Sequence, residues 1–313
     1  MKSFLDEEKS SANTALRIHV GDPAAKDIVS IIGNARVLLN GHTTISAEIM
    51  AACPALRSIV FLGTGASNYI DLASAKARGI HVATIKSYGD RTIAEHAFAL
   101  MLAAARNISR MDRDVRHGIW EAREGIELGG RTLGIIGAGS VGRMLASMAR
   151  DFGMKVLIWN RSEVPDEFVT MQSELDEVLS KADVLSIHLA LTEETNGFLG
   201  AAKLARTKPG VIIVNTARGA LIDETALLYA LESGQVSHAA LDVFGEEPLP
   251  PDSPFCSLDN VTLTSHAAFK SKEAAKRLLR QSLDIAFAQL DAHEGTRFSA
   301  ISSGVRSASR PRE

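Results

Sequence analysis

The sequence predicts an α/β protein in which helices cover parallel sheets. Short, continuously apolar runs alternate with helical segments, and this alternation occurs twice along the 313 residues. Apolar runs without polar alternation are typical of strands that are buried on both faces, as in parallel sheets. Alternating β and α segments favour the same architecture. A chain of this length exceeds what one hydrophobic core usually holds, so we expect two domains.

The first series of elements predicts a smaller domain, formed by residues 14–91 together with residues 271–295. Its helices are expected to begin near Pro23, Ser46 and Tyr69, and a closing helix is expected at Glu273–Leu290. Residues 1–13 and 296–313 are polar or Ser-rich, and we expect them to be disordered tails. The expected strands are Arg17–Val20, Ala35–Leu39, Ser58–Leu62 and His81–Ile85.

The second series predicts a larger domain, residues 92–270, that begins with a long helix at Thr92–Ile108. Six apolar runs follow, separated by helical segments, and they predict a doubly wound parallel sheet. These expected strands are Thr132–Ile136, Val156–Trp159, Val184–His188, Val211–Asn215, Ala239–Asp242 and Val261–Leu263.

Composition excludes several classes of protein. The longest apolar run, Ala97–Ala105, is too short to cross a bilayer, so we expect no membrane partner. The net charge is −3 with both signs interspersed, which does not favour nucleic-acid binding. The two cysteines, Cys53 and Cys256, lack metal-ligand spacing. They indicate neither a disulfide framework nor a metal site, and we expect buried thiols in a cytoplasmic protein.

A glycine-rich motif lies between the run ending at Ile136 and the next helical segment. Residues 137–142 read GAGSVG, which fits the G-x-G-x-x-G pattern of dinucleotide-binding turns. In that pattern Gly137 permits the tight turn, Gly139 lets the backbone approach the pyrophosphate, and Gly142 lets the helix pack close to the strand. The strand before the motif and the helix after it favour this interpretation over an ordinary glycine-rich turn.

The residues after the next strand predict which nicotinamide cofactor is bound. About 20 residues beyond the glycines, an Asp or Glu would bind the ribose 2′-hydroxyl of NAD. Here the positions are Asn160, Arg161 and Ser162, so no carboxylate repels a 2′-phosphate and a guanidinium can bind it. This favours NADP(H). The alternative is NAD(H), with Asn160 at the ribose and Arg161 in solvent.

Several separate blocks of sequence resemble the D-isomer-specific 2-hydroxyacid dehydrogenases. This family includes D-lactate, D-3-phosphoglycerate and glyoxylate/hydroxypyruvate enzymes. The resemblance implies a Rossmann-type dinucleotide-binding domain and a smaller, flavodoxin-like substrate domain. It extends from about Leu39 to Ala275 in the blocks GTGASNYIDL from Gly63, TIAEHAFALML from Thr92, GRTLGIIGAGSVGR from Gly130, VNTARGALIDETAL from Val214, ALDVFGEEPLP from Ala240 and NVTLTSHAAF from Asn260.

The family's three catalytic residues fall on Arg218, Glu247 and His266, each just after a predicted strand. Each residue type also suits the chemistry. A guanidinium can bind the carboxylate of a 2-oxo acid bidentately and polarise the neighbouring carbonyl. A histidine can give a proton to the alkoxide and take it back in reverse, and a carboxylate on its other nitrogen fixes the tautomer and stabilises the charged ring.

Other roles follow from the resemblance alone. The loop at Gly65 and Ala66 resembles the one that binds the substrate carboxylate. Thr216 and Asp242 match cofactor contacts near the nicotinamide, and Ser140 and Val141 match contacts to the pyrophosphate. The resemblance also implies a homodimer and a small 2-hydroxy or 2-oxo acid as substrate.

Two departures leave alternatives open. The smaller domain lacks about one strand-helix unit at its N-terminal side, and Ser265 replaces the proline that commonly precedes the catalytic histidine. The shortening is compatible with a catalytically idle NAD(P)-binding scaffold of the same fold. A dehydrogenase of another substrate class, such as formate or phosphite, is a further alternative.

Overall fold

The computed structural model describes residues 16–19, 21 and 23–294. The chain divides into two compact units. The smaller unit comprises residues up to 86 and residues from 276, and the larger unit comprises residues 87–275. The boundaries predicted from the sequence are 91/92 and 270/271. The predicted tails, 1–13 and 296–313, lie outside the described residues.

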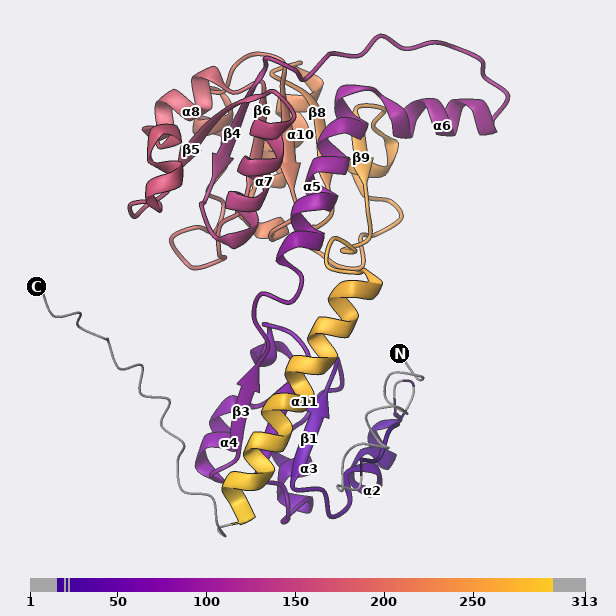
Figure 1. Ribbon diagram of the computed structural model, residues 1–313. Coiled ribbons are helices and arrows are strands. Elements are labelled where there is room, and N and C mark those ends of the chain that lie inside the picture. Colours follow the sequence, from indigo (N-terminus) through magenta and orange to yellow (C-terminus); the bar gives the residue numbers. More distant parts are fainter. Residues whose placement is uncertain (1–15, 20, 22, 295–313) are drawn as a thin grey trace, which may run out of the picture. The chain divides into compact units, whose positions relative to one another are not determined.

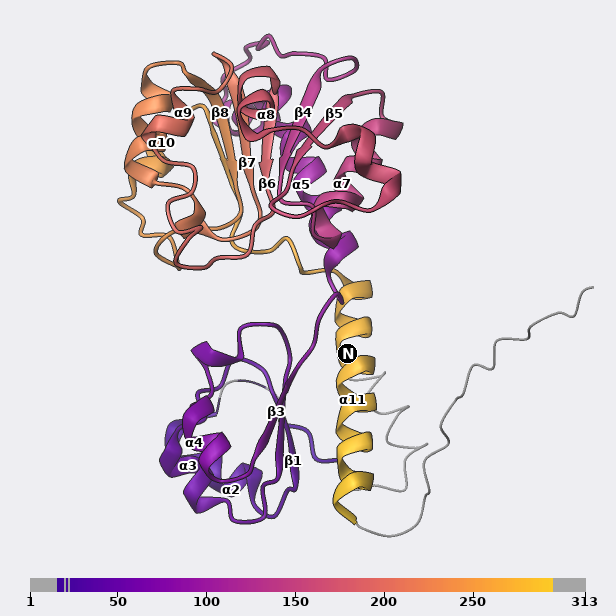
Figure 2. The same cartoon turned by 90° about the vertical axis from the view of Figure 1, so that its left-hand side faces the viewer.

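The smaller unit contains a three-stranded parallel sheet in the order β1-β2-β3. The helices α2, α3 and α4 pack on one face, and the part of α11 within this unit packs on the other face through Leu279 and Leu283, as Figure 2 shows. The elements are η1 (Ala25–Asp27), α2 (Ile28–Ile32), β1 (Val37–Asn40), α3 (Ala47–Ala52), β2 (Ser58–Phe61), η2 (Ala66–Asn68), α4 (Leu72–Ala77), β3 (His81–Thr84) and α11 (Lys272–Glu294).

The strand predicted at Arg17–Val20 is wrong for the residues that the structure describes there. Residues 16–19 have no regular structure. The guanidinium of Arg17 donates to the carbonyl of Ile32 at 2.9 Å, and Ile18 is exposed. A segment of β-forming residues becomes a strand only where a neighbouring strand accepts and donates its backbone hydrogen bonds. No strand of the three-stranded sheet pairs with residues 16–19.

The larger unit contains the predicted sheet of six parallel strands, in the order β5-β4-β6-β7-β8-β9. The chain passes from β4 to β5 on one side and returns to β6 on the other, so the topological switch lies between β4 and β6. The strands are β4 (Thr132–Ile136), β5 (Lys155–Trp159), β6 (Val184–Ile187), β7 (Val211–Asn215), β8 (Val236–Leu241) and β9 (Val261–Leu263).

Helices cover both faces of this sheet, as Figure 1 shows. Buried side chains of α5 and α7 form one core layer, and those of α8, α9 and α10 form the other. Because both faces are covered, the strands are continuously apolar, which is the pattern that made them predictable. The elements are α5 (Asp90–Ala105), α7 (Ser140–Asp151), η3 (Asp166–Met171), α8 (Leu175–Lys181), α9 (Ala201–Leu204), η4 (Gly219–Leu221), α10 (Glu224–Glu232) and η5 (Pro254–Ser257).

The long helix predicted at Thr92–Ile108 ends earlier than expected. α5 stops at Ala105, Asn107 adopts a left-handed backbone with φ of 53°, and a separate helix, α6 (Ile108–Arg116), follows. Asparagine tolerates this conformation because its short side chain can bond nearby backbone; its amide donates to the carbonyl of Glu124 at 2.8 Å. Of the two cysteines, Cys53 is buried as expected, but Cys256 is exposed on η5.

Candidate active site

The glycine-rich turn joins β4 to α7 at the switch point of the six-stranded sheet. Gly137 has a positive φ of 99°, and its N–H donates to the carbonyl of Trp159 at 2.8 Å. A Cβ on Gly142 would lie 2.2 Å from the carbonyl oxygen of Gly137, so only glycine permits this packing of helix on strand. The geometry matches the roles that the sequence predicts for these two positions.

The first turn of α7 is open to an anion. Gly139 is its N-cap and no side chain caps the helix, while a Cβ on Gly139 would meet nothing within 4 Å. The helix N-terminus therefore presents backbone N–H groups beside free space. Ser140 and Val141 are its first residues. The hydroxyl of Ser140 donates to the carboxylate of Asp90, a contact that the sequence analysis did not anticipate.

The three residues after β5 differ in what they contact. The side-chain oxygen of Asn160 accepts from the N–H of Ala138 at 3.0 Å, so this residue supports the glycine-rich turn. Its amide nitrogen donates to the carbonyl and hydroxyl oxygens of Ser162 at 2.9 and 3.1 Å. Arg161 is exposed and forms an ion pair with Glu194 at 3.0 Å. Glu194 was not predicted as a partner, because it lies 33 residues further along the chain than Arg161.

A buried asparagine shapes the loop that carries Arg218. Asn215, at the end of β7, accepts from the N–H of Ala217 at 3.0 Å and donates to the carbonyl of Arg218 at 2.9 Å. A Cβ on Gly219 would lie 1.9 Å from the backbone of Phe244, so glycine lets this loop approach the loop after β8. Neither role was predicted. The signals in the sequence were a polar residue, Asn215, at the end of an apolar strand and a glycine, Gly219, directly after the arginine.

Arg218 itself is exposed, and its guanidinium donates to the carbonyl of Ala217 at 2.6 Å. No carboxylate of the described residues forms an ion pair with it, so it can bind an anionic group. The ring of Tyr88 is half-buried nearby. Burial raises the pKa of Tyr88, and the positive charge of Arg218 acts in the opposite direction.

Glu247 and His266 are brought together from the loops after β8 and β9. The Nδ1 atom of His266 lies 2.6 Å from Oε2 of Glu247, and both side chains are about one-third exposed. The other oxygen of Glu247 accepts from the N–H of Phe244 at 3.0 Å, which orients the carboxylate. The contact at Nδ1 leaves Nε2 of His266 as the ring nitrogen that can exchange a proton with a substrate.

Asp242, just after β8, lies fully buried beneath the loop of His266. Its carboxylate accepts from Thr264 Oγ1 at 2.6 Å and from the N–H groups of Ala267 and Ala268, both at 2.8 Å. Burial tends to raise its pKa, but hydrogen bonds from His96, Thr264 and the two backbone groups outweigh burial and hold the pKa at about 2. Its carboxylate is therefore charged at neutral pH.

The residues of the larger unit fit a dinucleotide. The turn at Gly137–Gly142 and the uncapped end of α7 suit a pyrophosphate, and the hydroxyl of Thr216 is buried without a hydrogen-bond partner among the described residues. Such an unsatisfied hydroxyl is available to a bound group. Gly65 and Ala66 lie in the smaller unit, at the start of η2, where Ala66 is buried. Over residues 16–294, as far as they are described, no cluster of His, Cys, Asp or Glu could hold a metal ion.

Comparison with known proteins identifies the family. The family model described as "D-isomer specific 2-hydroxyacid dehydrogenase, NAD binding domain" matches residues 98–268, which is more than half of the chain. The chain belongs to this family. The activity class of the D-2-hydroxyacid dehydrogenases, NAD(P)-dependent oxidoreduction of 2-hydroxy acids, agrees with the sequence prediction, and no comparison favours the idle scaffold.

Individual relatives of this dehydrogenase family match most of the chain. The glyoxylate reductase of Korarchaeum cryptofilum is 38% identical over 82% of this chain and 80% of its own length. The hydroxypyruvate reductase of Blautia hydrogenotrophica is 36% identical over 81% of this chain and 82% of its own. The crystal structure of a glyoxylate reductase from Paecilomyes thermophila has a TM-score of 0.78 at 29% identity and covers 93% of both chains. The chain spans about half the length of the curated D-3-phosphoglycerate dehydrogenases that it matches.

Proposed function

We propose that this dehydrogenase reduces a small 2-oxo acid, or oxidises the matching D-2-hydroxy acid, and that NADP(H) is its favoured cofactor. The observation that carries the proposal is the 2.6 Å contact between Nδ1 of His266 and Glu247. This contact and the exposed guanidinium of Arg218 occur at loops that follow adjacent strands, β7, β8 and β9. The carboxyl ends of these strands are where doubly wound sheets bind their ligands.

Arg218 binds the substrate in this proposal. Its planar guanidinium has no carboxylate partner among the described residues, so a 2-oxo acid can take that place. Two parallel N–H groups can hold the substrate carboxylate while a third polarises the carbonyl oxygen beside it. Lysine, which has a single rotating ammonium group, would orient the acid less well.

His266 moves the proton. Its Nε2 gives a proton to the carbonyl oxygen during reduction and takes one from the hydroxyl during oxidation. Glu247 holds Nδ1, which fixes the tautomer and compensates the positive charge of the protonated ring. When bound, the nicotinamide ring supplies the hydride to the substrate carbon or accepts it from there.

The larger unit holds the dinucleotide in this proposal. The N–H groups of Ser140, Val141 and Gly142 would hold the pyrophosphate, and Gly137 and Gly139 would let it approach the backbone. By the family resemblance, the hydroxyl of Thr216, unpartnered among the described residues, would contact the cofactor near its nicotinamide. Gly65 and Ala66 of the smaller unit contribute backbone groups to the substrate carboxylate, a role that rests on the family resemblance.

The preference for NADP(H) rests on Asn160, Arg161 and Ser162. No carboxylate follows β5 at the position that binds the ribose in NAD-specific enzymes. The Arg161 guanidinium and the Ser162 hydroxyl offer donors for a 2′-phosphate. Glu194 competes for Arg161 through their ion pair, so we expect the preference to be modest.

The test is oxidation of NADPH and of NADH, in separate assays, with glyoxylate, hydroxypyruvate, pyruvate and phenylpyruvate. Loss of absorbance at the reduced-nicotinamide band, with NADPH preferred and D-glycerate formed from hydroxypyruvate, is the expected result. Turnover with NADH alone would retain the dehydrogenase and contradict the cofactor preference. Cofactor binding without turnover on any 2-oxo acid would favour the scaffold, and reduction of NAD(P)⁺ by formate or phosphite would indicate the other substrate class.

We also propose that the dehydrogenase is a homodimer, paired through residues 107–126, which we call the arm. The arm comprises α6 and the segment that returns toward β4 (Figure 1). It exposes large apolar side chains, above all Trp120, which is 92% exposed. An exposed apolar surface of this kind marks an interaction site. Its other exposed apolar residues are Ile108, Val115 and Ile119.

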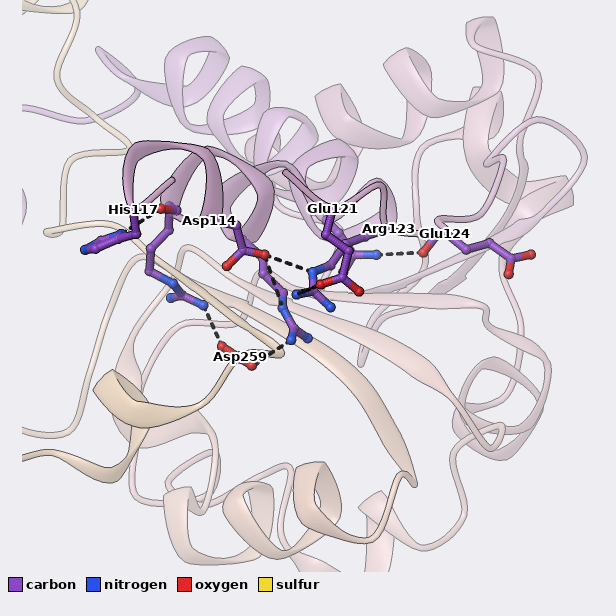
Figure 3. Close-up of polar contacts among 9 residues, drawn as sticks. Asp114, His117, Glu121, Arg123, Glu124 and Asp259 are labelled. Carbon is purple, nitrogen blue, oxygen red and sulfur yellow. Dashed lines mark hydrogen bonds and ion pairs between the residues drawn. The ribbon is translucent and has the colours of Figure 1, made fainter. Parts of the chain in front are cut away.

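A charged network holds the arm in place, as Figure 3 shows. Arg110 and Arg113 each bind one oxygen of Asp259, at 2.8 and 2.7 Å, and Arg123 binds Asp114 at 3.0 Å. Asp259 precedes β9, so the network ties α6 to the sheet. Because these ion pairs hold the arm while its apolar side chains are exposed, it is suited to pack against a second copy.

Light scattering in solution tests the dimer. We expect a mass of two 33.5 kDa chains for the wild type and of one chain for Trp120→Ser. Tyr229→Ser is the matched control, because Tyr229 is also an exposed aromatic residue but lies on α10, outside the arm. A dimer that survives Trp120→Ser, or one that is lost with Tyr229→Ser, would contradict pairing through the arm.

A further inference from the structure

Asp242 contacts the loop of His266 at several consecutive places. Its carbonyl oxygen accepts from the N–H of His266 at 2.8 Å. Its two carboxylate oxygens accept from the N–H groups of Ala267 and Ala268, each at 2.8 Å. The two peptide groups that flank the His266 Cα atom are therefore both hydrogen-bonded to Asp242, the residue that follows β8.

The backbone of His266 needs such support. It has a φ of 47°, in the left-handed region that few residues other than glycine adopt. Residues held in this region persist where the surrounding structure determines them, and they occur often at functional sites. The peptide groups bound by Asp242 flank this strained residue, so they decide where its ring points.

Two side chains complete the surroundings of the Asp242 carboxylate. Thr264 Oγ1 donates to it at 2.6 Å, and His96 Nε2 of α5 lies 3.1 Å from Thr264 Oγ1 and 3.5 Å from Asp242 Oδ1. With these neighbours, the Asp242 side chain is fully buried and its carboxylate is surrounded by donors from the protein itself.

We propose that Asp242 is a positioning residue, which fixes the left-handed backbone of His266 and thereby aims its ring at Glu247 on one side and at the substrate on the other. His96 and Thr264 assist by holding the Asp242 carboxylate in place. This role differs from the cofactor contact that the family resemblance implies for Asp242. Its catalytic consequence rests on the proposed function, whereas its effect on the loop does not.

Asp242→Asn tests the proposal, because it keeps the size of the side chain but replaces one acceptor oxygen by an NH₂ group, which cannot accept from a backbone N–H. In cofactor-free protein, we expect hydrogen exchange of the peptide spanning residues 264–270 to become at least about tenfold faster. We expect kcat to fall by about 10- to 100-fold. KM for the 2-oxo acid and Kd for NADPH should change by less than about threefold, because the buried carboxylate of Asp242 is already occupied by donors of the protein itself.

Asp183→Asn is the matched control. Asp183 is another largely buried carboxylate of the larger unit that binds a backbone N–H, that of Thr132 at 2.8 Å, but it precedes β6 at the opposite edge of the sheet. We expect faster exchange near Thr132 and a lower thermal midpoint, with kcat unchanged within about twofold.

Two substitutions at Thr264 give an independent test with little effect on folding. Thr264→Val removes the hydroxyl that donates to Asp242, whereas Thr264→Ser keeps it. We expect kcat to fall by about 3- to 10-fold in the first and to be restored in the second, with KM unchanged. If Asp242→Asn does not fold, this pair decides the matter. Equal kcat values for Val and Ser would then overturn the proposal.

The remaining outcomes are distinct. Weaker NADPH binding with unchanged exchange at residues 264–270 would overturn the proposal in favour of the cofactor contact. Faster exchange with unchanged kcat would overturn the positioning role. A wild-type protein without turnover on any 2-oxo acid contradicts the proposed function instead, and the exchange measurement alone then decides whether Asp242 holds the loop.

Discussion

Charged residues find different partners at the two ends of the parallel strands in the six-stranded sheet. The amino edge is the side on which the strands begin, and the carboxyl edge is the side on which they finish. At the amino edge, Asp183 is 11% exposed and is fully partnered by Lys208 at 2.7 Å, by Arg131 at 3.4 Å and by the N–H of Thr132. At the carboxyl edge, Arg218 has no carboxylate partner among the described residues and Thr216 keeps a buried hydroxyl free. The amino edge is therefore satisfied by the protein itself, whereas the carboxyl edge keeps groups available for ligands.

The difference follows from where each polar group obtains its partners. At the amino edge, the carboxylate of Asp183 pairs with two cations and accepts from the backbone N–H at the start of β4, so its partners all come from the folded chain. At the carboxyl edge, the backbone of His266 is in the left-handed region and the backbone of Gly219 lies close to that of Phe244. This strained or close-packed backbone brings polar side chains together without pairing all of them. Substitutions at the first edge should change stability, and those at the second should change turnover.

The largest effect is expected for His266→Ala. Removing the proposed proton donor should lower kcat by about 10³-fold, within the range for general acid–base catalysis. Binding of NADPH, measured by fluorescence titration, should remain within about twofold because His266 belongs to the proton-transfer pair. Full turnover in this variant would place the proton donor elsewhere and contradict the assignment of turnover to the carboxyl edge.

A buried histidine between the two edges should govern stability at acidic pH. His238, within β8, bonds Thr262 of β9 at 2.9 Å, and burial lowers its pKa from 6.5 to about 4. The unfolded chain takes up the proton first, so stability is complete above pH 6.5 and is lost as the pH falls toward 4. A shift of this size corresponds to about 3 kcal/mol.

His238→Gln tests this, because glutamine can bond Thr262 but does not titrate. The free energy of unfolding, from urea titrations between pH 4.5 and 7, should depend less steeply on pH in the variant than in the wild type. Some dependence should remain, since burial also lowers the pKa of His188 to about 4. Equal slopes in the two proteins would exclude His238 as a source of acid sensitivity.

Asp183→Asn should lower the free energy of unfolding at pH 7 by about 1–3 kcal/mol, because charged hydrogen bonds at a largely buried site are lost. Burial tends to raise the pKa of Asp183, but Lys208, the N–H of Thr132 and Arg131 outweigh it, so the pKa is lowered. The stabilisation is thus present above the ordinary value of 3.8 and lost as the pH falls through the folded pKa. Urea unfolding at pH 7 and pH 3 measures this; a deficit that persists undiminished at pH 3 would contradict it.

The smallest effect is expected at the ion pair between Arg161 and Glu194. Glu194→Gln should free the guanidinium and increase the ratio of NADPH to NADH affinity by less than about fivefold, because both side chains are exposed and solvent screens them. Arg161→Ala should lower the same ratio. Fluorescence titration with both cofactors measures it, and a ratio that is equal in all three proteins would remove Arg161 from cofactor selection.

Much of the larger unit could be predicted from local sequence. All six strands were expected because each is an apolar run buried on both faces, and the glycine-rich turn was recognised between a strand and a helix. Arg17–Val20 has a similar local pattern but forms no strand where it is described, since no neighbour pairs with it. In the same way, apolar periodicity alone predicted one continuous helix, whereas the left-handed backbone of Asn107 separates α5 from α6.

The contacts within the site were less predictable. Family resemblance named Arg218, Glu247 and His266. Asn215 supports Arg218 from three residues away in the same loop. The contacts of Gly219 with Phe244 and of Asp242 with Ala267, by contrast, join residues that are 25 apart in the sequence and meet only at the sheet edge. The same holds for Asn160: the sequence placed it at the ribose, and the folded chain uses its oxygen to hold the glycine-rich turn. Hydrogen bonds between distant loops produce no periodic pattern of residues from which they could be predicted.

Local burial patterns and motifs were enough to predict the fold class, the family, the order of the strands along the chain and the residue types of the proposed catalytic set. Three contacts became evident only in the folded chain: Asp242 lies beneath the loop of His266, Glu194 pairs with Arg161, and Asp183 binds its partners at the opposite edge. These contacts arise where parallel strands bring their ends together, and their geometry depends on the packing of the whole sheet rather than on any one segment.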